Sequence, residues 1–225
     1  MEGIGRGSLG GALSRVLPTL THYWLRSLAA PAVGDGVLSQ QEQAWGAGLP
    51  PALRQRYLAS RVLLRCCVAP LLTLDPQHLP LHSPPGEAPR LETGCGHVSL
   101  SHSGGQLLIA WSPQPIGVDL EWAQRPVPAA ALARRFYPPQ EAARLLALPV
   151  AAQPRALLES WVRKEAAIKW QGSALARDLR HWLWDEEVGQ LRHLAAGWAP
   201  PSLCREVAGW LCGAVGEAAG GGIWG

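Results

Sequence analysis

The spacing of apolar positions predicts a chain built from both helices and strands. Over residues 49–72, apolar side chains recur at roughly helical spacing behind two prolines that favour a helix start. From His97 onward the period changes to two, which predicts strands over 97–101 and 106–111. Gly104-Gly105 between them can form a tight turn, so the two strands are expected to form a hairpin.

The same alternation continues in a third strand over 116–122, after a short linker at 112–115. The Pro- and Gly-rich stretch 76–96 predicts a long loop, and the Gly-rich ends, 1–20 and 216–225, are expected to be loose. Beyond the third strand, the pattern predicts helices over 127–136, 139–147 and 154–171 and strands over 180–184, 190–194 and 207–212.

Composition and charge limit the kinds of protein that this sequence can encode. Hydrophobic residues make up 48% of the 225, which favours a folded chain over a disordered one. A net charge of +3 is too small to indicate a nucleic-acid partner, but arginines that outnumber lysines suit a small anionic ligand. The sequence has neither an apolar run that could span a membrane nor the apolar region of a secretory signal. Its 5 cysteines are scattered, and none shows the paired C-x-x-C spacing that is typical of a zinc site. We therefore expect a cytoplasmic protein with no membrane partner.

The segment 117–121, Gly-Val-Asp-Leu-Glu, is the first candidate for chemistry. On a strand, Asp119 and Glu121 project from the same face, about 7 Å apart. Two carboxylates directed at one place suit a hard divalent cation such as Mg²⁺. Gly117 beside them allows a ligand or a backbone segment to approach closely. Taken alone, a strand that exposes its acids to solvent explains the pattern better.

The segment 161–169 places Trp161, Glu165 and Lys169 one turn apart on one face of a helix. Glu165 could serve as a third metal ligand or as a general base, and Lys169 could bind a phosphate. The alternative is an ordinary Glu–Lys pair at the surface, with Trp161 filling the core.

Two further segments carry groups that bind phosphate. Residues 99–105, Ser-Leu-Ser-His-Ser-Gly-Gly, offer hydroxyls, an imidazole and a Gly turn, although no nucleophile elbow surrounds the serines. A structural histidine is the alternative there. The helix over 49–72 carries Arg54, Arg56, Arg61 and Arg65, which could bind a nucleotide phosphate or form a solvated face.

In combination and in this order, three segments resemble the 4′-phosphopantetheinyl transferase superfamily, Sfp type. They are Ser101-His102-Ser103, the acidic strand 117–121, and the W-x-x-K-E-A-x-x-K helix 161–169. The overlap runs from about residue 89 to 172, and 56–65 is similar to the family's N-terminal helix. The family's G-K-P-like run is replaced here by Gly-Glu-Ala-Pro-Arg at 86–90, where Arg90 is the expected substitute for the lysine.

The resemblance implies an α+β fold of two similar α/β subdomains in a pseudo-twofold arrangement. The expected halves are residues 1–113 and 114–225, with coenzyme A in the cleft between them. The implied protein is a monomer.

The implied reaction is a Mg²⁺-dependent transfer of 4′-phosphopantetheine from coenzyme A to a serine of an apo acyl or peptidyl carrier protein, releasing 3′,5′-ADP. Such carriers serve fatty acid, polyketide and nonribosomal peptide biosynthesis. By resemblance, the metal ligands are Asp119, Glu121 and Glu165; the catalytic residues are Glu165, Lys169 and His102; and the coenzyme A contacts are Arg56, Arg90, Ser101, His102, Lys164 and Lys169.

Two alternatives stay open at the level of sequence. One is a degenerate family member that binds coenzyme A or a carrier protein without turnover. The other is a different metal-dependent phosphotransferase or a nuclease that uses the same acids.

Overall fold

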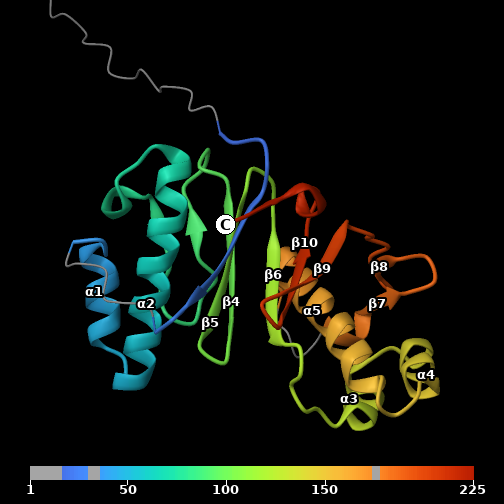
Figure 1. Ribbon diagram of the computed structural model, residues 1–225. Helices are drawn as coiled ribbons and strands as arrows, with labels where there is room; N and C mark the ends of the chain where they lie inside the picture. Colours follow the sequence, from blue (N-terminus) through green and yellow to red (C-terminus); the bar gives the residue numbers. More distant parts are fainter. Residues whose placement is uncertain (1–16, 30–35, 174–177) are drawn as a thin grey trace, which may run out of the picture.

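The computed structural model of the protein describes residues 17–29, 36–173 and 178–225 (Figure 1). The expectation of a loose N-terminus falls mostly on residues 1–16, which lie outside the described residues. Leu17, where the description begins, already packs against the first core. The helices are α1 (Gln40–Ala47), α2 (Pro51–Val68), α3 (Ala129–Phe136), α4 (Pro139–Ala147) and α5 (Gln153–Gln171).

Among the described residues, the strands form two main sheets and two small ribbons. The first sheet has the order β11-β1-β5-β4, and the second sheet has the order β6-β10-β9; β2 pairs with β3, and β7 with β8. All pairs are antiparallel except β1 with β11. The strand bounds are β1 His22–Ser27, β2 Leu81–His82, β3 Arg90–Leu91, β4 His97–Ser103, β5 Gln106–Ser112, β6 Gly117–Trp122, β7 Trp182–Asp185, β8 Gln190–His193, β9 Ser202–Val207, β10 Trp210–Val215 and β11 Ile223–Trp224.

The elements stack in layers, with α2 outside the first sheet and α5 outside the second (Figure 1). Leu64 and Val68 of α2 share a core with Leu107 and Ile109 of β5. The opposite face of the first sheet packs against the second sheet through residues that alternate with these, because neighbouring strand residues point to opposite faces. That second core contains Tyr23, Leu108, Ala110, Val118, Leu120, Cys212 and Ala214.

Most predicted elements are confirmed. The helix predicted over 49–72 is α2 followed by a 3₁₀ turn at 69–72, and β4 and β5 form the expected hairpin. The strand predicted over 207–212 is displaced: β10 begins only at Trp210 and runs to Val215, because Ala208 and Gly209 both have positive φ and make the turn between β9 and β10. The sequence pattern also missed α1 and β1, and the predicted loop 76–96 contains the small β2–β3 ribbon.

The C-terminal segment is ordered, contrary to the expectation for 216–225. Strand β11 pairs in parallel with β1, and the Trp224 ring stacks on Tyr23 with centroids 4.6 Å apart. Strand β11 is therefore an edge strand of the first sheet. No helix within the described ranges is long and apolar enough to cross a membrane.

Candidate active site

Two glycines fix helix α5 against the second sheet. A Cβ atom on Gly117 would lie 2.0 Å from the Ala166 carbonyl oxygen, and one on Gly213 would lie 2.4 Å from the Val162 carbonyl oxygen. Only glycine permits this approach. The sequence predicted that a ligand or a backbone segment could lie close to Gly117, and in the structure that segment is helix α5. The close packing brings Lys169 of α5 to Asp119 of β6.

The acids and Lys169 line one cavity of about 310 Å³, here called the carboxylate cavity. Asp119 is only 3% exposed. Its Oδ1 accepts from the Ser101 hydroxyl at 2.7 Å and from Lys169 Nζ at 2.8 Å, whereas its buried Oδ2 has no partner among the described residues. The lining consists of Leu100, Ser101, His102, Asp119, Leu120, Glu121, Glu165 and Lys169.

The other two carboxylates of this cavity have different surroundings. Glu121 accepts from the Ser103 hydroxyl at 3.0 Å and pairs with Arg125. Burial raises the pKa of Glu121, an effect that Arg125 opposes and Asp119 reinforces. Burial also raises the pKa of Glu165 to about 8; Asp119 adds to the rise and Lys169 opposes it. Three acidic side chains therefore line one cavity, and the positive charge beside them is too small to balance three ionised carboxylates.

A divalent cation fits this donor set. Carboxylate oxygens are the ligands that Mg²⁺ prefers, and waters and phosphate oxygens usually complete its shell. The Oδ2 of Asp119 has no partner among the described residues, and burial raises the pKa values of Glu121 and Glu165, so a bound cation would stabilise the ionised form of all three carboxylates. In the part of the chain that the structure describes, no group of three or more His, Cys, Asp or Glu side chains is already arranged to hold a metal ion. If such an ion binds here, Asp119, Glu121 and Glu165 would supply its protein ligands.

A second cavity, of about 330 Å³, lies on the α2 side of β4 and is here called the arginine cavity. It shares Leu100 and His102 with the carboxylate cavity, so the two spaces adjoin at this part of β4. Burial lowers the pKa of His102, and Arg56 and Lys169 lower it further. Its lining consists of Leu49, Leu53, Arg56, Tyr57, Ser60, Arg61, Pro85, Gly86, Glu87, Leu100 and His102.

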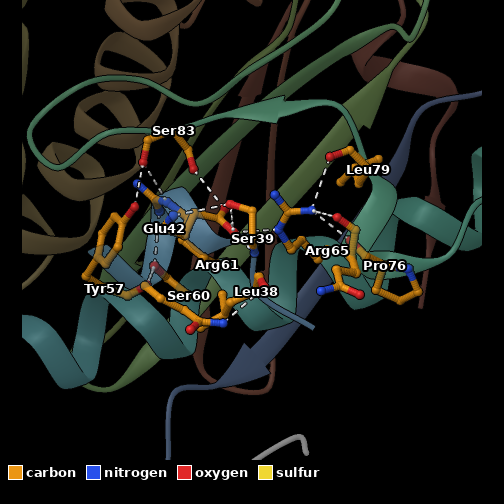
Figure 2. A network of polar contacts seen from close by, with 12 residues as sticks. Leu38, Ser39, Glu42, Tyr57, Ser60, Arg61, Arg65, Pro76, Leu79 and Ser83 are labelled. Atoms are coloured by element: carbon orange, nitrogen blue, oxygen red, sulfur yellow. Dashed lines mark hydrogen bonds and ion pairs between the residues drawn. The ribbon is translucent and has the colours of Figure 1, made fainter. Parts of the chain in front are cut away.

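A buried polar network supports the wall of the arginine cavity (Figure 2). Glu42 of α1 and Arg65 of α2 form an ion pair of 2.7 Å with exposures of 0% and 1%. Arg65 also donates to the carbonyls of Pro76 and Leu79, and Glu42 accepts from the Ser83 hydroxyl. The network thus ties α1 and α2 to the segment that leads into the cavity rim.

Ser83 is also held through its carbonyl. The Tyr57 hydroxyl donates to it at 3.0 Å, and Arg61 Nε donates at 3.3 Å (Figure 2). The arginines of α2 therefore do not form a single solvated face: Arg61 and Arg65 are buried, whereas Arg56 is exposed at the cavity.

The expected contact between Lys164 and coenzyme A phosphates does not fit the structure. Lys164 Nζ lies 2.6 Å from Glu141 Oε2, and both side chains are 0% exposed. The ammonium also lies 3.8 Å from the centroid of the Tyr137 ring. Five helical residues rotate a side chain by more than a third of a turn, so Lys164 faces α4 when Lys169 faces the cavity. Lys164 secures the helix that carries Glu165.

Two other expected coenzyme A contacts have different partners. Arg90 is 66% exposed and pairs with Glu87 at 3.1 Å, and the lining of the arginine cavity includes Glu87 rather than Arg90. The Ser101 hydroxyl donates to Asp119 instead of facing open solvent. Sequence reasoning assigned no role to Glu42, although Ser39 and Glu42 have the spacing of a capping box that would have indicated α1.

Comparison with known proteins adds evidence that is independent of this geometry. Residues 115–210 match the family model of the 4′-phosphopantetheinyl transferase superfamily. A Synechocystis sp. protein named "Putative 4'-phosphopantetheinyl transferase slr0495" is 30% identical over 178 residues, which cover 76% of this chain and 72% of that protein. The 4′-phosphopantetheinyl transferase Sfp of Bacillus subtilis is 35% identical over 83 residues, 37% of this chain and 36% of Sfp. HetI, a 4′-phosphopantetheinyl transferase of Nostoc sp., is 30% identical over 133 residues, 56% of each chain. As its sequence motifs predicted, the chain belongs to the 4′-phosphopantetheinyl transferase superfamily.

Proposed function

We propose that the protein transfers the 4′-phosphopantetheine moiety of coenzyme A to a serine of an apo acyl or peptidyl carrier protein, with Mg²⁺ as cofactor. The observation that supports this most directly is the pair of cavities that adjoin at His102. One offers the exposed guanidinium of Arg56 for a nucleotide phosphate, and the other offers acids and a lysine for a metal-bound pyrophosphate. Residues of both proposed halves, 1–113 and 114–225, contribute to the carboxylate cavity.

In this proposal the nucleotide end of coenzyme A occupies the arginine cavity. Arg56 would pair with the 3′-phosphate, since an exposed guanidinium presents several donors to phosphate oxygens. His102, neutral near pH 7 because its pKa is lowered, would donate a hydrogen bond to the pyrophosphate at the junction. Lys169 would contact the same pyrophosphate from α5.

The reaction joins the serine oxygen of the carrier to the β-phosphorus of coenzyme A and breaks the bond from that phosphorus to the bridging oxygen. The bridging oxygen leaves with 3′,5′-ADP. Bound Mg²⁺ would neutralise charge on the pyrophosphate and so favour the departure of this group. Asp119 and Glu121 would serve as ligands, while Glu165 would serve as a ligand and accept the serine proton.

The test is incubation of the protein with coenzyme A, Mg²⁺ and several apo carrier proteins, followed by intact-mass spectrometry of each carrier. We expect the mass of phosphopantetheine on at least one acyl or peptidyl carrier, and none when EDTA replaces Mg²⁺. A carrier whose target serine is changed to alanine is the matched control and should stay unmodified. No mass increase on any carrier would contradict the proposal and favour a binding module without turnover.

A further inference from the structure

Three serines of β4 connect the first sheet to the second. Ser99, Ser101 and Ser103 alternate along the strand, so their side chains point to the same side. The backbone of β4 pairs with β5, and β6 belongs to the other sheet. The serine side chains bridge the two sheets where backbone pairing does not.

Each serine reaches a different group of β6, in register along the strand. The Ser99 hydroxyl oxygen accepts from the Val118 N–H at 3.1 Å. The Ser101 hydroxyl donates to Asp119 Oδ1 at 2.7 Å, and the Ser103 hydroxyl donates to Glu121 Oε2 at 3.0 Å. Ser99 therefore bonds a backbone group of β6, whereas Ser101 and Ser103 bond the carboxylates of the candidate metal site.

The contact from Ser101 determines which oxygen of Asp119 stays available. Ser101 and Lys169 both donate to Oδ1, from β4 and from α5 respectively. Two donors from different elements fix the plane of the carboxylate. Oδ2 is buried and has no partner in the described ranges, and Asp119 belongs to the lining of the carboxylate cavity.

Glu121 is held in a similar way. Ser103 donates to Oε2, and Arg125 pairs with Oε1. Arg125 is 49% exposed and comes from the loop after β6, so it is the more easily displaced partner. When Arg125 moves away, Ser103 still holds the other oxygen.

We propose that Ser101 and Ser103 are positioning residues that orient the carboxylates of Asp119 and Glu121 for a divalent cation. The proposal rests on the proposed function to the extent that it takes these acids as metal ligands. Partners that orient metal ligands change metal affinity by about 10- to 100-fold in other proteins. A serine suits this task because its short side chain has few rotamers and its hydroxyl can always donate to a carboxylate.

The test measures metal binding directly, without coenzyme A or a carrier. Mn²⁺ is titrated into the full-length protein, and free Mn²⁺ is followed by electron paramagnetic resonance, with Mg²⁺ competition to give its affinity. We expect Ser101→Ala to raise the Kd of both metals about tenfold and Ser103→Ala to raise it about threefold, since Glu121 keeps Arg125. Ser101→Thr, which keeps the hydroxyl, should bind within about twofold of wild type.

Ser99→Ala is the matched control, because it removes a hydroxyl from the same strand that serves only the backbone N–H of Val118. We expect it to lower the thermal stability while the Kd for Mn²⁺ stays as in wild type. If Ser99→Ala weakens metal binding as much as Ser101→Ala, the serines only join the sheets and the proposal is wrong.

Each of the remaining outcomes also supports or contradicts the positioning role. Unchanged metal affinity in folded Ser101→Ala contradicts the proposal, as does a wild-type protein that binds no Mn²⁺. If Ser101→Ala does not fold, Ser103→Ala decides, since Ser103 is less buried. A protein that binds Mn²⁺ in a Ser101-dependent way but modifies no carrier would contradict the proposed transfer and leave the positioning role intact.

Discussion

Glu42 and Asp119 are both buried carboxylates paired with a cation, yet their surroundings differ. Both oxygens of Glu42 accept hydrogen bonds: Oε1 from Ser83, and Oε2 from Ser39 and Arg65. Asp119 has one oxygen without a partner among the described residues, and it shares its cavity with Glu121 and Glu165. A fully bonded ion pair serves the scaffold, whereas crowded acids with an open coordination position indicate a binding site.

The largest expected effect is a loss of stability when the carboxylate of Glu42 is removed from its buried hydrogen-bond network. Glu42→Ala leaves the buried Arg65 guanidinium without its carboxylate, so we expect a loss of about 3–5 kcal/mol in the free energy of unfolding. Urea denaturation measures it. Glu87→Ala, which breaks an exposed pair with Arg90, is the control and should cost at most about 1 kcal/mol. Equal losses in the two variants would remove the distinction between the scaffold pair and a surface pair.

The next effect is on activity, and it comes from Asp119, the carboxylate with one unpartnered oxygen among the described residues. Asp119→Ala should lower the rate of carrier modification by at least about a hundredfold, since loss of a ligand exceeds the usual effect of losing an outer partner. Circular dichroism should show a folded protein. Asp185→Ala, which breaks the Asp185–Arg192 pair of the β7–β8 ribbon, is the matched control and should keep wild-type activity. Full activity in Asp119→Ala would contradict the metal assignment.

A smaller effect is expected in the arginine cavity. Arg56→Ala should raise the KM for coenzyme A about tenfold and change kcat less, because a charged hydrogen bond to phosphate contributes about 1.5–3 kcal/mol. Arg54→Ala is the control on the same helix, since Arg54 donates to the carbonyls of Gly46 and Ala47 instead. An unchanged KM in Arg56→Ala would remove Arg56 from the nucleotide site.

The last expected effect is on the pH dependence of stability without metal. The pKa of Glu165 is raised from 4.5 to about 8, so between these values the folded protein keeps a proton that the unfolded chain releases. The stability that Glu165 contributes is therefore complete below pH 4.5 and falls as the pH rises toward 8. Urea denaturation in EDTA from about pH 5 to about pH 8 should show a shallower decline for Glu165→Gln than for wild type. Parallel curves would show that Glu165 is an ordinary surface acid.

Local patterns were enough to predict much of the fold near the site. The alternation in 116–122 and the helical spacing in 154–171 correspond to β6 and α5, because each pattern reflects one face turned to a core. Helix α1 was missed because its sequence, QQEQAWGA, has no apolar period. Strand β11 was missed because a two-residue strand is stabilised only by its distant partner, β1.

The sequence by itself determined the family, the order of the three motifs and the face that Asp119 shares with Glu121, because these depend on residue identity and on the period of a single element. Only the tertiary structure decided which of the two motif lysines reaches the cavity: Lys169 pairs with Asp119, and Lys164 is enclosed with Glu141. The partner of a side chain depends on which elements pack together. For the same reason, Ser101 contacts a carboxylate of β6, and the acids of β6 and α5 line one cavity only because Gly117 lets the helix approach the strand.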